Sequence, residues 1–124
     1  MVSYAIKSKI GGAIGISVGA LSVISGSMVL LGIKQPGYHL LISLVIYNVL
    51  MDAISVVAGV VIWQQRAAAL RFSLLIAAAH AIVLLLLTIA RLMAVPVAPE
   101  SFAAMLFRTL TWGGISYLIW RKES

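Results

Sequence analysis

Apolar residues fall into four long runs that are separated by short polar or proline-containing segments. A helix needs roughly 20 residues to cross a hydrocarbon core of about 30 Å, and each run is long enough to do so. The runs cover residues 10–33, 39–63, 69–94 and 101–120. The segments between and after them contain Lys34, Gln35, Pro36 and Gly37, then Gln64, Gln65 and Arg66, then Pro96 to Pro99, and finally Arg121 and Lys122. The pattern predicts an all-α fold with one domain over residues 1–124, a four-transmembrane-helix bundle with up-down-up-down topology.

The composition excludes an ordinary soluble domain. Of the 124 residues, 63% are hydrophobic and 10% are charged, whereas soluble domains are about 45–50% apolar. The net charge of +6 comes from nine basic residues scattered between apolar runs, so they form no continuous surface for nucleic acid. Cysteine is absent, which excludes disulfides, iron–sulfur clusters and thiol catalysis. We therefore expect an integral membrane protein surrounded by lipid.

Basic residues predict which ends of the helices face the cytoplasm. Cytoplasmic loops of membrane proteins carry an excess of lysine and arginine. In the up-down-up-down topology, most basic residues near the span ends fall on the side that holds both termini and the second loop: Lys7, Lys9, Arg66, Arg71, Arg121 and Lys122. Trp63, Tyr117 and Trp120 lie near the same ends and fit interfacial anchoring. Both termini are therefore expected to be cytoplasmic.

The first run carries a stripe of small residues at helical spacing. Two overlapping GxxxG motifs begin it, and the full stripe consists of Gly11, Gly15, Gly19, Ser22 and Gly26. Such a stripe lets another helix backbone approach closely. We favour a neighbour within the same chain, and a second copy of the chain stays open as the alternative. Gly113 and Gly114 form a second small-residue position in the fourth run.

Polar residues in the other three runs keep to one face of each predicted helix. We expect these faces to point inward and to form one polar cluster inside the bundle. Its predicted members are Asn48, Asp52 and Ser55 in the second run, His80 and Arg91 in the third, and Arg108 and Thr111 in the fourth.

Asp52 and His80 are the central pair of this prediction. Each lies 14 residues from Arg66 in the turn between their helices, so a hairpin puts them at the same depth. An ionisable group in hydrocarbon costs roughly 3 kcal/mol or more, which makes a functional site or a buried pair the default interpretation. One carboxylate cannot neutralise both arginines. For Arg91 we favour a side chain that reaches the headgroups, while for Arg108 this and an inward position are both open.

The candidate chemistry is limited. His80 is either a hydrogen-bonded link between helices or a proton-accepting partner of Asp52. His39 lies roughly 20 Å from the level of His80, so the two histidines cannot clamp one haem within the chain. A single histidine and a single carboxylate leave a metal site short of ligands. We expect no metal, no cofactor and no enzymatic activity, because no nucleophile or metal constellation is present.

Two segments resemble a pattern in small, uncharacterised four-helix membrane proteins of prokaryotes. The first runs from Tyr47 to Met51 and continues through Ser55, Ala58, Gly59 and Val60 to Trp63. The second contains Ala103, Ala104, Met105, Arg108, Thr109 and Trp112. The resemblance implies a four-helix protein of the prokaryotic cytoplasmic membrane in which Asn48, Arg108 and Trp112 form one cluster. It implies no activity or ligand, and Asp52 stands where such proteins often have a small residue.

Two functional hypotheses follow. In the first, the chain is a non-catalytic subunit or assembly factor of a larger or homo-oligomeric membrane complex, and its polar interior holds the helices together. In the second, it is a small proton-coupled transporter or channel for an anionic solute, with Asp52 and His80 as the protonation pair and Arg108 as the anion contact. We favour the first, because four helices leave little volume for a solute path.

Overall fold

The computed structural model describes residues 3–32, 42–95, 97 and 99–120, and over these residues the only regular structure is helical. The helices are α1 (Tyr4–Leu30), α2 (Ile42–Trp63), α3 (Ala69–Leu92) and α4 (Pro99–Ile119). Each is long and apolar enough to cross a membrane, which confirms the predicted all-α four-helix fold. The predicted first loop and the start of the second span at residue 39 lie outside the described residues, as do Pro96, Arg121 and Lys122.

Helix α1 begins earlier than the hydropathy pattern predicts, at Tyr4 instead of residue 10. Ser3 caps it, because its side-chain oxygen accepts a hydrogen bond from the Ile6 backbone N–H at 3.3 Å. Lys7 and Lys9 therefore belong to the helix, although they lie outside its most apolar stretch. Hydropathy marks where a helix enters the membrane, which is not where its hydrogen bonding starts.

The other helix ends agree closely with the sequence prediction. Helix α2 stops at Trp63, and Gln65 follows in the left-handed region with a φ of 55°. The Arg66 backbone N–H then donates to the Val61 carbonyl at 3.2 Å, which closes the turn before α3. Helix α4 starts at Pro99, a favourable first position because the missing N–H would have had no partner there.

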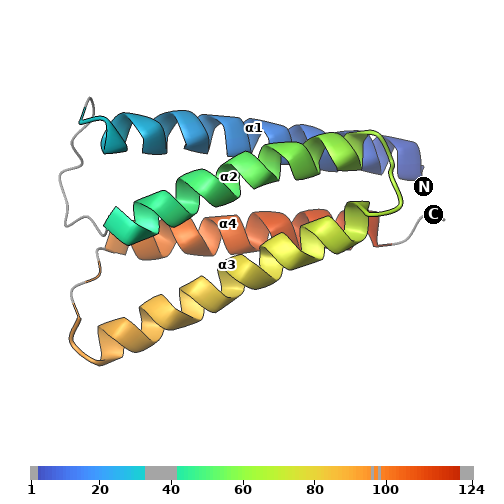
Figure 1. Cartoon of the computed structure of the whole chain (residues 1–124). Coiled ribbons are helices and arrows are strands. Elements are labelled where there is room, and N and C mark those ends of the chain that lie inside the picture. The colour runs from blue at the N-terminus through green and yellow to red at the C-terminus, as the bar shows by residue number, and fades with distance from the viewer. Residues whose placement is uncertain (1–2, 33–41, 96, 98, 121–124) are drawn as a thin grey trace.

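Consecutive helices run antiparallel, so the start of α1, the α2–α3 turn and the end of α4 lie at the same end of the molecule (Figure 1). We call this the terminal end and the other the distal end. Helix α1 packs along α2, and α3 packs along α4, whereas α2 and α3 touch over a much shorter stretch. Helix α3 diverges from the other helices towards the distal end (Figure 1).

Glycines in α1 allow the close contact with α2. A Cβ atom added to Gly12 would lie 2.7 Å from the Gly59 carbonyl oxygen, and one added to Gly19 would lie 2.8 Å from the Asp52 carbonyl oxygen. Both distances are shorter than real Cβ contacts, so the backbones meet directly at these two points. Gly19 of the predicted stripe, and Gly12 outside it, thus meet a helix of the same chain.

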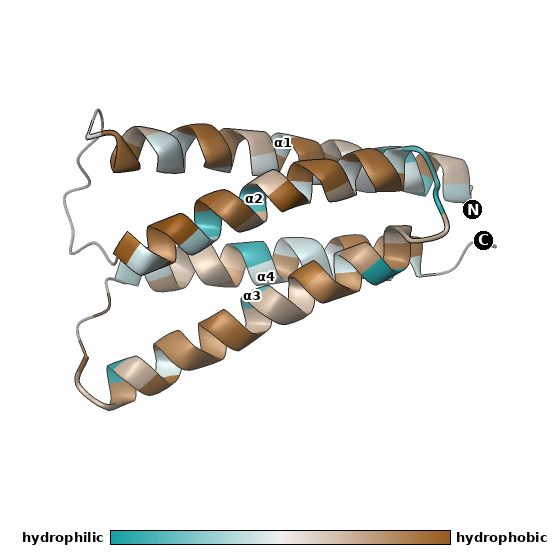
Figure 2. Ribbon diagram, in the orientation of Figure 1, coloured by the Kyte–Doolittle hydropathy of each residue, from teal (hydrophilic) through white to brown (hydrophobic). Residues whose placement is uncertain are grey.

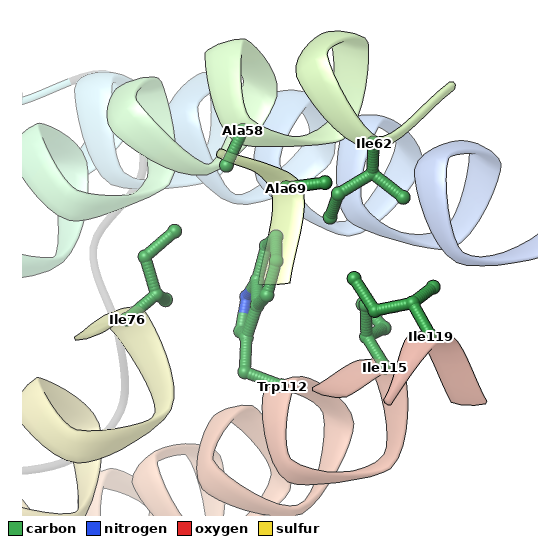
Figure 3. Packing of buried hydrophobic residues seen from close by; sticks show 7 residues of the cluster. All are labelled: Ala58, Ile62, Ala69, Ile76, Trp112, Ile115 and Ile119. Atoms are coloured by element: carbon green, nitrogen blue, oxygen red, sulfur yellow. The ribbon is translucent and has the colours of Figure 1, made fainter. Parts of the chain in front are cut away.

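An apolar core fills the half of the bundle near the terminal end. Trp112 of α4 is only 2% exposed and lies at its centre, with its indole ring pointing towards α2 (Figure 3). Gly15 makes room for this ring, since a Cβ atom there would lie 3.0 Å from Trp112 Cη2. The other members of this cluster are Ala58, Ile62, Ala69, Ile76, Ile115 and Ile119.

The outer surface is apolar over most of its area. Large hydrophobic side chains on all four helices are exposed. The hydrophilic stretches of the ribbon are short, and they lie within α2 and α4, at the ends of α3 and in the α2–α3 turn (Figure 2). A water-soluble bundle would have charged residues on this face, whereas hydrocarbon is the natural solvent for it. The surface and the four spans together have the character of a membrane protein.

Candidate functional site

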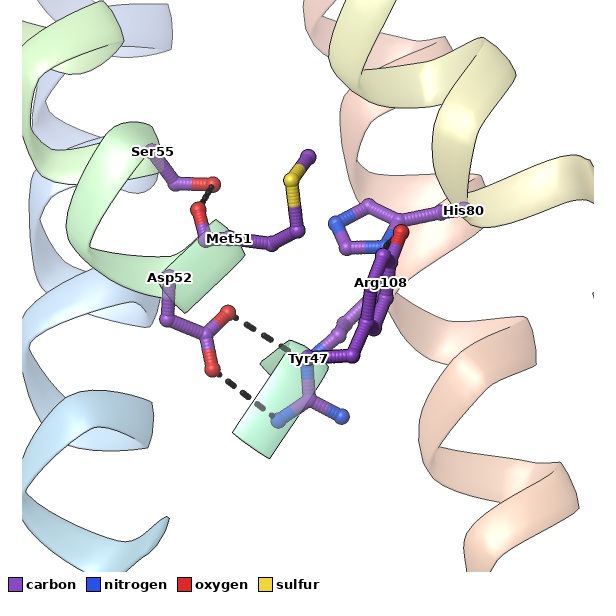
Figure 4. A network of polar contacts seen from close by, with 6 residues as sticks. All are labelled: Tyr47, Met51, Asp52, Ser55, His80 and Arg108. Atoms are coloured by element: carbon purple, nitrogen blue, oxygen red, sulfur yellow. Dashed lines mark hydrogen bonds and ion pairs between the residues drawn. The ribbon is translucent and has the colours of Figure 1, made fainter. Parts of the chain in front are cut away.

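An ion pair links α2 to α4 in the middle of the bundle. Arg108 donates from Nε to Asp52 Oδ1 and from its terminal nitrogen to Oδ2, both at 3.4 Å (Figure 4). The Asp52 side chain is 3% exposed and that of Arg108 is 14% exposed. Charge-assisted hydrogen bonds are usually about 2.7–2.9 Å long, so this two-pronged contact is loose. Arg108 therefore lies inside the bundle, with its charge directed to a carboxylate.

A second polar contact links α2 to α3. The Tyr47 hydroxyl and His80 Nδ1 share a hydrogen bond at 3.2 Å, and the two rings meet edge to face with centroids 5.9 Å apart. The imidazole is fully buried, and its other nitrogen, Nε2, makes no hydrogen bond with the described residues. Tyr47 reaches His80 across the region where α2 and α3 begin to separate.

A third contact links α3 to α4. Ser116 donates a hydrogen bond to Ser73 Oγ at 3.0 Å, and both side chains are buried. The Ser116 hydroxyl also lies 2.8 Å from the Trp112 carbonyl of its own helix, and Ser73 donates to the Leu70 carbonyl. This contact lies near the terminal end, beside the apolar core.

The predicted direct pair of Asp52 and His80 is wrong. Each side chain has another partner, Arg108 for Asp52 and Tyr47 for His80 (Figure 4). Equal depth was not sufficient, because the turn of α2 that carries Asp52 packs against Gly19 of α1 instead of against α3. The carboxylate consequently faces α4, and the imidazole meets α2 at Tyr47.

The remaining predicted cluster members have separate environments. Ser55 is buried but donates to the Met51 carbonyl of its own helix, and Thr111 donates likewise to the Phe107 carbonyl. Arg91 is exposed at the distal end of α3, so it takes no part in an inner cluster. Its position agrees with a side chain that reaches the headgroups.

Asn48 and Arg108 line one cavity of about 260 Å³ between α1, α2 and α4. Asn48 Oδ1 is buried and accepts no hydrogen bond from the described residues. Ser22 and Gly26, the last two members of the α1 stripe, also line this cavity. The stripe therefore has two uses: its first part packs against α2 and α4, and its last part forms a cavity wall. Trp112, which the resemblance groups with Asn48 and Arg108, is in the apolar core instead.

Some residues that pack or link the helices were not predicted from the sequence. Gly12 makes a closer approach to α2 than most of the predicted glycine stripe, yet it lies outside the GxxxG spacing. Ser116 and Tyr47 link helices, but a serine or tyrosine among apolar residues has no distinctive pattern. Ser8 is buried, and its hydroxyl group has no hydrogen-bond partner in the described part of the chain. Its position three residues before Gly11 continues the small-residue stripe and could have indicated its burial.

No protein-family model matches the chain, and no curated protein or solved structure shows significant similarity to it. The resemblance to small prokaryotic four-helix proteins therefore stays a prediction. Among the described residues, no group of three or more His, Cys, Asp or Glu side chains is placed to hold a metal ion.

The contact between Tyr47 and His80 gives a first testable expectation. Tyr47→Phe removes the hydroxyl group, so neither ring nitrogen of His80 then has a hydrogen-bond partner among the described residues. The free energy of unfolding should fall by about 0.6–1.7 kcal/mol, from the average to the maximum found for hydrogen bonds between membrane helices. Unfolding in mixed detergent micelles measures the change. Tyr117→Phe is the matched control, because Tyr117 is 85% exposed. Equal effects of the two substitutions would show that the Tyr47 hydroxyl does not stabilise the bundle.

Proposed function

We propose that the chain is a non-catalytic subunit or assembly factor of a membrane complex, formed either with further copies of itself or with other membrane proteins. The observation that carries this proposal is the use of the buried polar residues. Asp52 with Arg108, Tyr47 with His80, and Ser73 with Ser116 each join a different pair of helices. Polar residues used in this way act as links between helices.

The outer surface supports the same proposal. Leu50 and Val57 of α2 and Leu75, Leu85 and Leu86 of α3 are all more than half exposed, so the two helices offer long apolar faces beside the region where they diverge. Association between membrane helices relies on packing of such faces, because lipid supplies no hydrophobic driving force. A protein of 124 residues with this surface is suited to pack against other spans within the bilayer.

The distribution of basic residues indicates which end of the bundle faces the cytoplasm. Lys7, Lys9, Arg66 and Arg71 lie at or near the terminal end, while Arg91 and Glu100 lie at the distal end. The excess of basic residues at the terminal end favours the cytoplasm for that side. We place the protein in the cytoplasmic membrane of a prokaryote, as the resemblance implies.

The second hypothesis, a proton-coupled carrier, loses its protonation pair because Asp52 and His80 do not meet. The cavity beside Arg108 still favours the binding of a solute, and this is the one observation that keeps a transport function as an alternative.

The subunit proposal predicts the mass of the purified particle. In mild detergent and in lipid nanodiscs, light scattering should give a multiple of the 13.2 kDa chain, or a complex with a stoichiometric membrane partner that survives two chromatographic steps. Since the sequence has no cysteine, Leu86→Cys on exposed α3 provides a clean cross-linking probe, and Ser116→Cys in the buried interior is its matched control. A stable monomer that cross-links to nothing in its native membrane would contradict the proposal.

A further inference from the structure

The cavity between α1, α2 and α4 differs from the rest of the interior. Its lining runs from the distal ends of the three helices, at Val29, Leu44 and Ser101, inward to Arg108. The apolar core around Trp112 occupies the opposite half of the bundle. A polar cavity in this position is within reach of the headgroup region at the distal end of the spans.

Hydrogen-bond donors dominate the polar part of the lining. Arg108 borders the cavity, whereas its partner Asp52 does not. A guanidinium group has five N–H donors in a fixed planar arrangement, and Asp52 accounts for two of them. The lining also contains the hydroxyl groups of Ser22 and Ser101. This set suits a ligand that accepts several hydrogen bonds, and an oxyanion does so best.

Charge limits the ligand further. Because Asp52 already neutralises much of the Arg108 charge, a monoanion is better tolerated here than a dianion. The loose 3.4 Å contacts leave the guanidinium able to share its donors with a second acceptor. A phosphodiester, with one negative charge and two free oxygens, meets both conditions.

Asn48 indicates that the ligand should also contain a hydrogen-bond donor. Its buried Oδ1 has no donor among the described residues, and an unpaired buried acceptor costs about 1–3 kcal/mol. Asn48 lines the cavity, so rotation of its amide group towards the cavity would bring Oδ1 within reach of a hydroxyl group next to the phosphate. The apolar side chains of Leu21, Val29, Leu44 and Val45 form the rest of the wall and suit the hydrocarbon part of a lipid.

We propose that this cavity binds a phosphodiester that carries a neighbouring hydroxyl group, the chemistry of a glycerol-type phospholipid headgroup. The planar guanidinium group of Arg108 is suited to donate hydrogen bonds to the oxygens of a phosphate group. The free diester glycerophosphoglycerol offers the same groups from the aqueous side, so the experiment separates the two sources. The proposal holds whether the chain works alone or in a complex.

The test uses the full chain in nanodiscs of phosphatidylcholine mixed with phosphatidylglycerol. Native mass spectrometry after gentle release should show one phosphatidylglycerol retained per chain, with a preference over phosphatidylcholine of at least about tenfold, the ratio that 1.4 kcal/mol corresponds to. Free glycerophosphoglycerol, the deacylated headgroup of phosphatidylglycerol, is then added as a competitor. Displacement of the lipid at millimolar concentration identifies the soluble ester as a ligand as well, and retention identifies the lipid as the ligand.

Two variants and one control locate the site. Ser22→Leu fills the cavity from α1 without touching the ion pair, and Asn48→Leu removes the buried acceptor. Both should reduce lipid retention about tenfold. Ser17→Leu is the matched control, because Ser17 is exposed on the same helix, and its retention should equal that of the wild type. The proposal is overturned if the wild type shows no preference for phosphatidylglycerol and binds no glycerophosphoglycerol, or if both cavity variants retain the lipid as the wild type does.

Discussion

Gly12→Ala should destabilise the protein by about 1–3 kcal/mol, the usual cost of forcing extra atoms into a packed interface. The added Cβ atom would lie 2.7 Å from the Gly59 carbonyl oxygen and 2.9 Å from the Trp63 backbone nitrogen. Backbone atoms cannot swing aside as a flexible side chain can, so α1 and α2 must separate along part of their length. Detergent titration of the folded protein, followed by circular dichroism, measures the loss.

Gly113→Ala is the matched control for this experiment. A Cβ atom at Gly113 meets nothing within 4 Å, so the substitution creates no clash. Alanine is also the better helix former, by about 0.5–1 kcal/mol. The same chemical change should therefore lower stability at position 12 and leave it unchanged or raise it at position 113. Similar losses at both positions would mean that helix packing around Gly12 is looser than the structure has it.

Gly15 shows why the spacing of the glycines predicted the helix contact but not its details. The GxxxG pattern implies that small residues face another helix, and Gly19 does meet the backbone of α2. Gly15 lies between the indole ring of Trp112 from α4 and the Gly59 backbone of α2, and Gly11 faces the side chain of Ile115. Which partner fills each gap depends on how three helices cross, and that is not encoded in the spacing of one helix.

The number and extent of the helices could be predicted because they depend on local properties. Runs of apolar residues, and the polar residues and prolines between them, determine where a chain can cross a bilayer. The predicted third span, residues 69–94, differs from α3 by two residues at one end only. The start of α1 was missed because Ser3 acts through a single hydrogen bond, which hydropathy does not register.

The partners of the polar residues could not be predicted in the same way. Depth along the helices placed Asp52 and His80 together, but contact also depends on the rotation of each helix about its axis. Close packing of α1 on α2 at Gly12 and Gly19 sets that rotation for α2. In the resulting orientation the Asp52 side chain points towards Arg108 of α4. For Arg108, an inward position in the polar cluster and a position that reaches the headgroups were both open, and His80 was expected to be the partner of Asp52. Arginine nevertheless suits a buried carboxylate, because its planar guanidinium group can donate two hydrogen bonds to the two oxygens.

A double-mutant cycle on Asp52 and Arg108 should show the largest energetic coupling in the protein. Asp52→Leu leaves the Arg108 guanidinium without its carboxylate inside the bundle, and the loss of one partner from a buried pair costs about 3–5 kcal/mol. The double variant with Arg108→Leu removes both charges together. It should therefore be more stable than Asp52→Leu alone, because no charge is left unpaired and two leucines suit an apolar interior. Free energies of unfolding in mixed micelles are measured for the wild type, the two single variants and the double variant.

The matching cycle of Asp52 with His80 tests the geometry that separates these two residues. Their side chains have different partners, so His80→Leu should add its own cost to that of Asp52→Leu, with a coupling well below that of the Asp52–Arg108 cycle. A strong coupling with His80 and a weak one with Arg108 would mean that the carboxylate faces α3 in the membrane. In that case the packing of Gly19 against the Asp52 turn would also be wrong, since it is this contact that directs the carboxylate to α4.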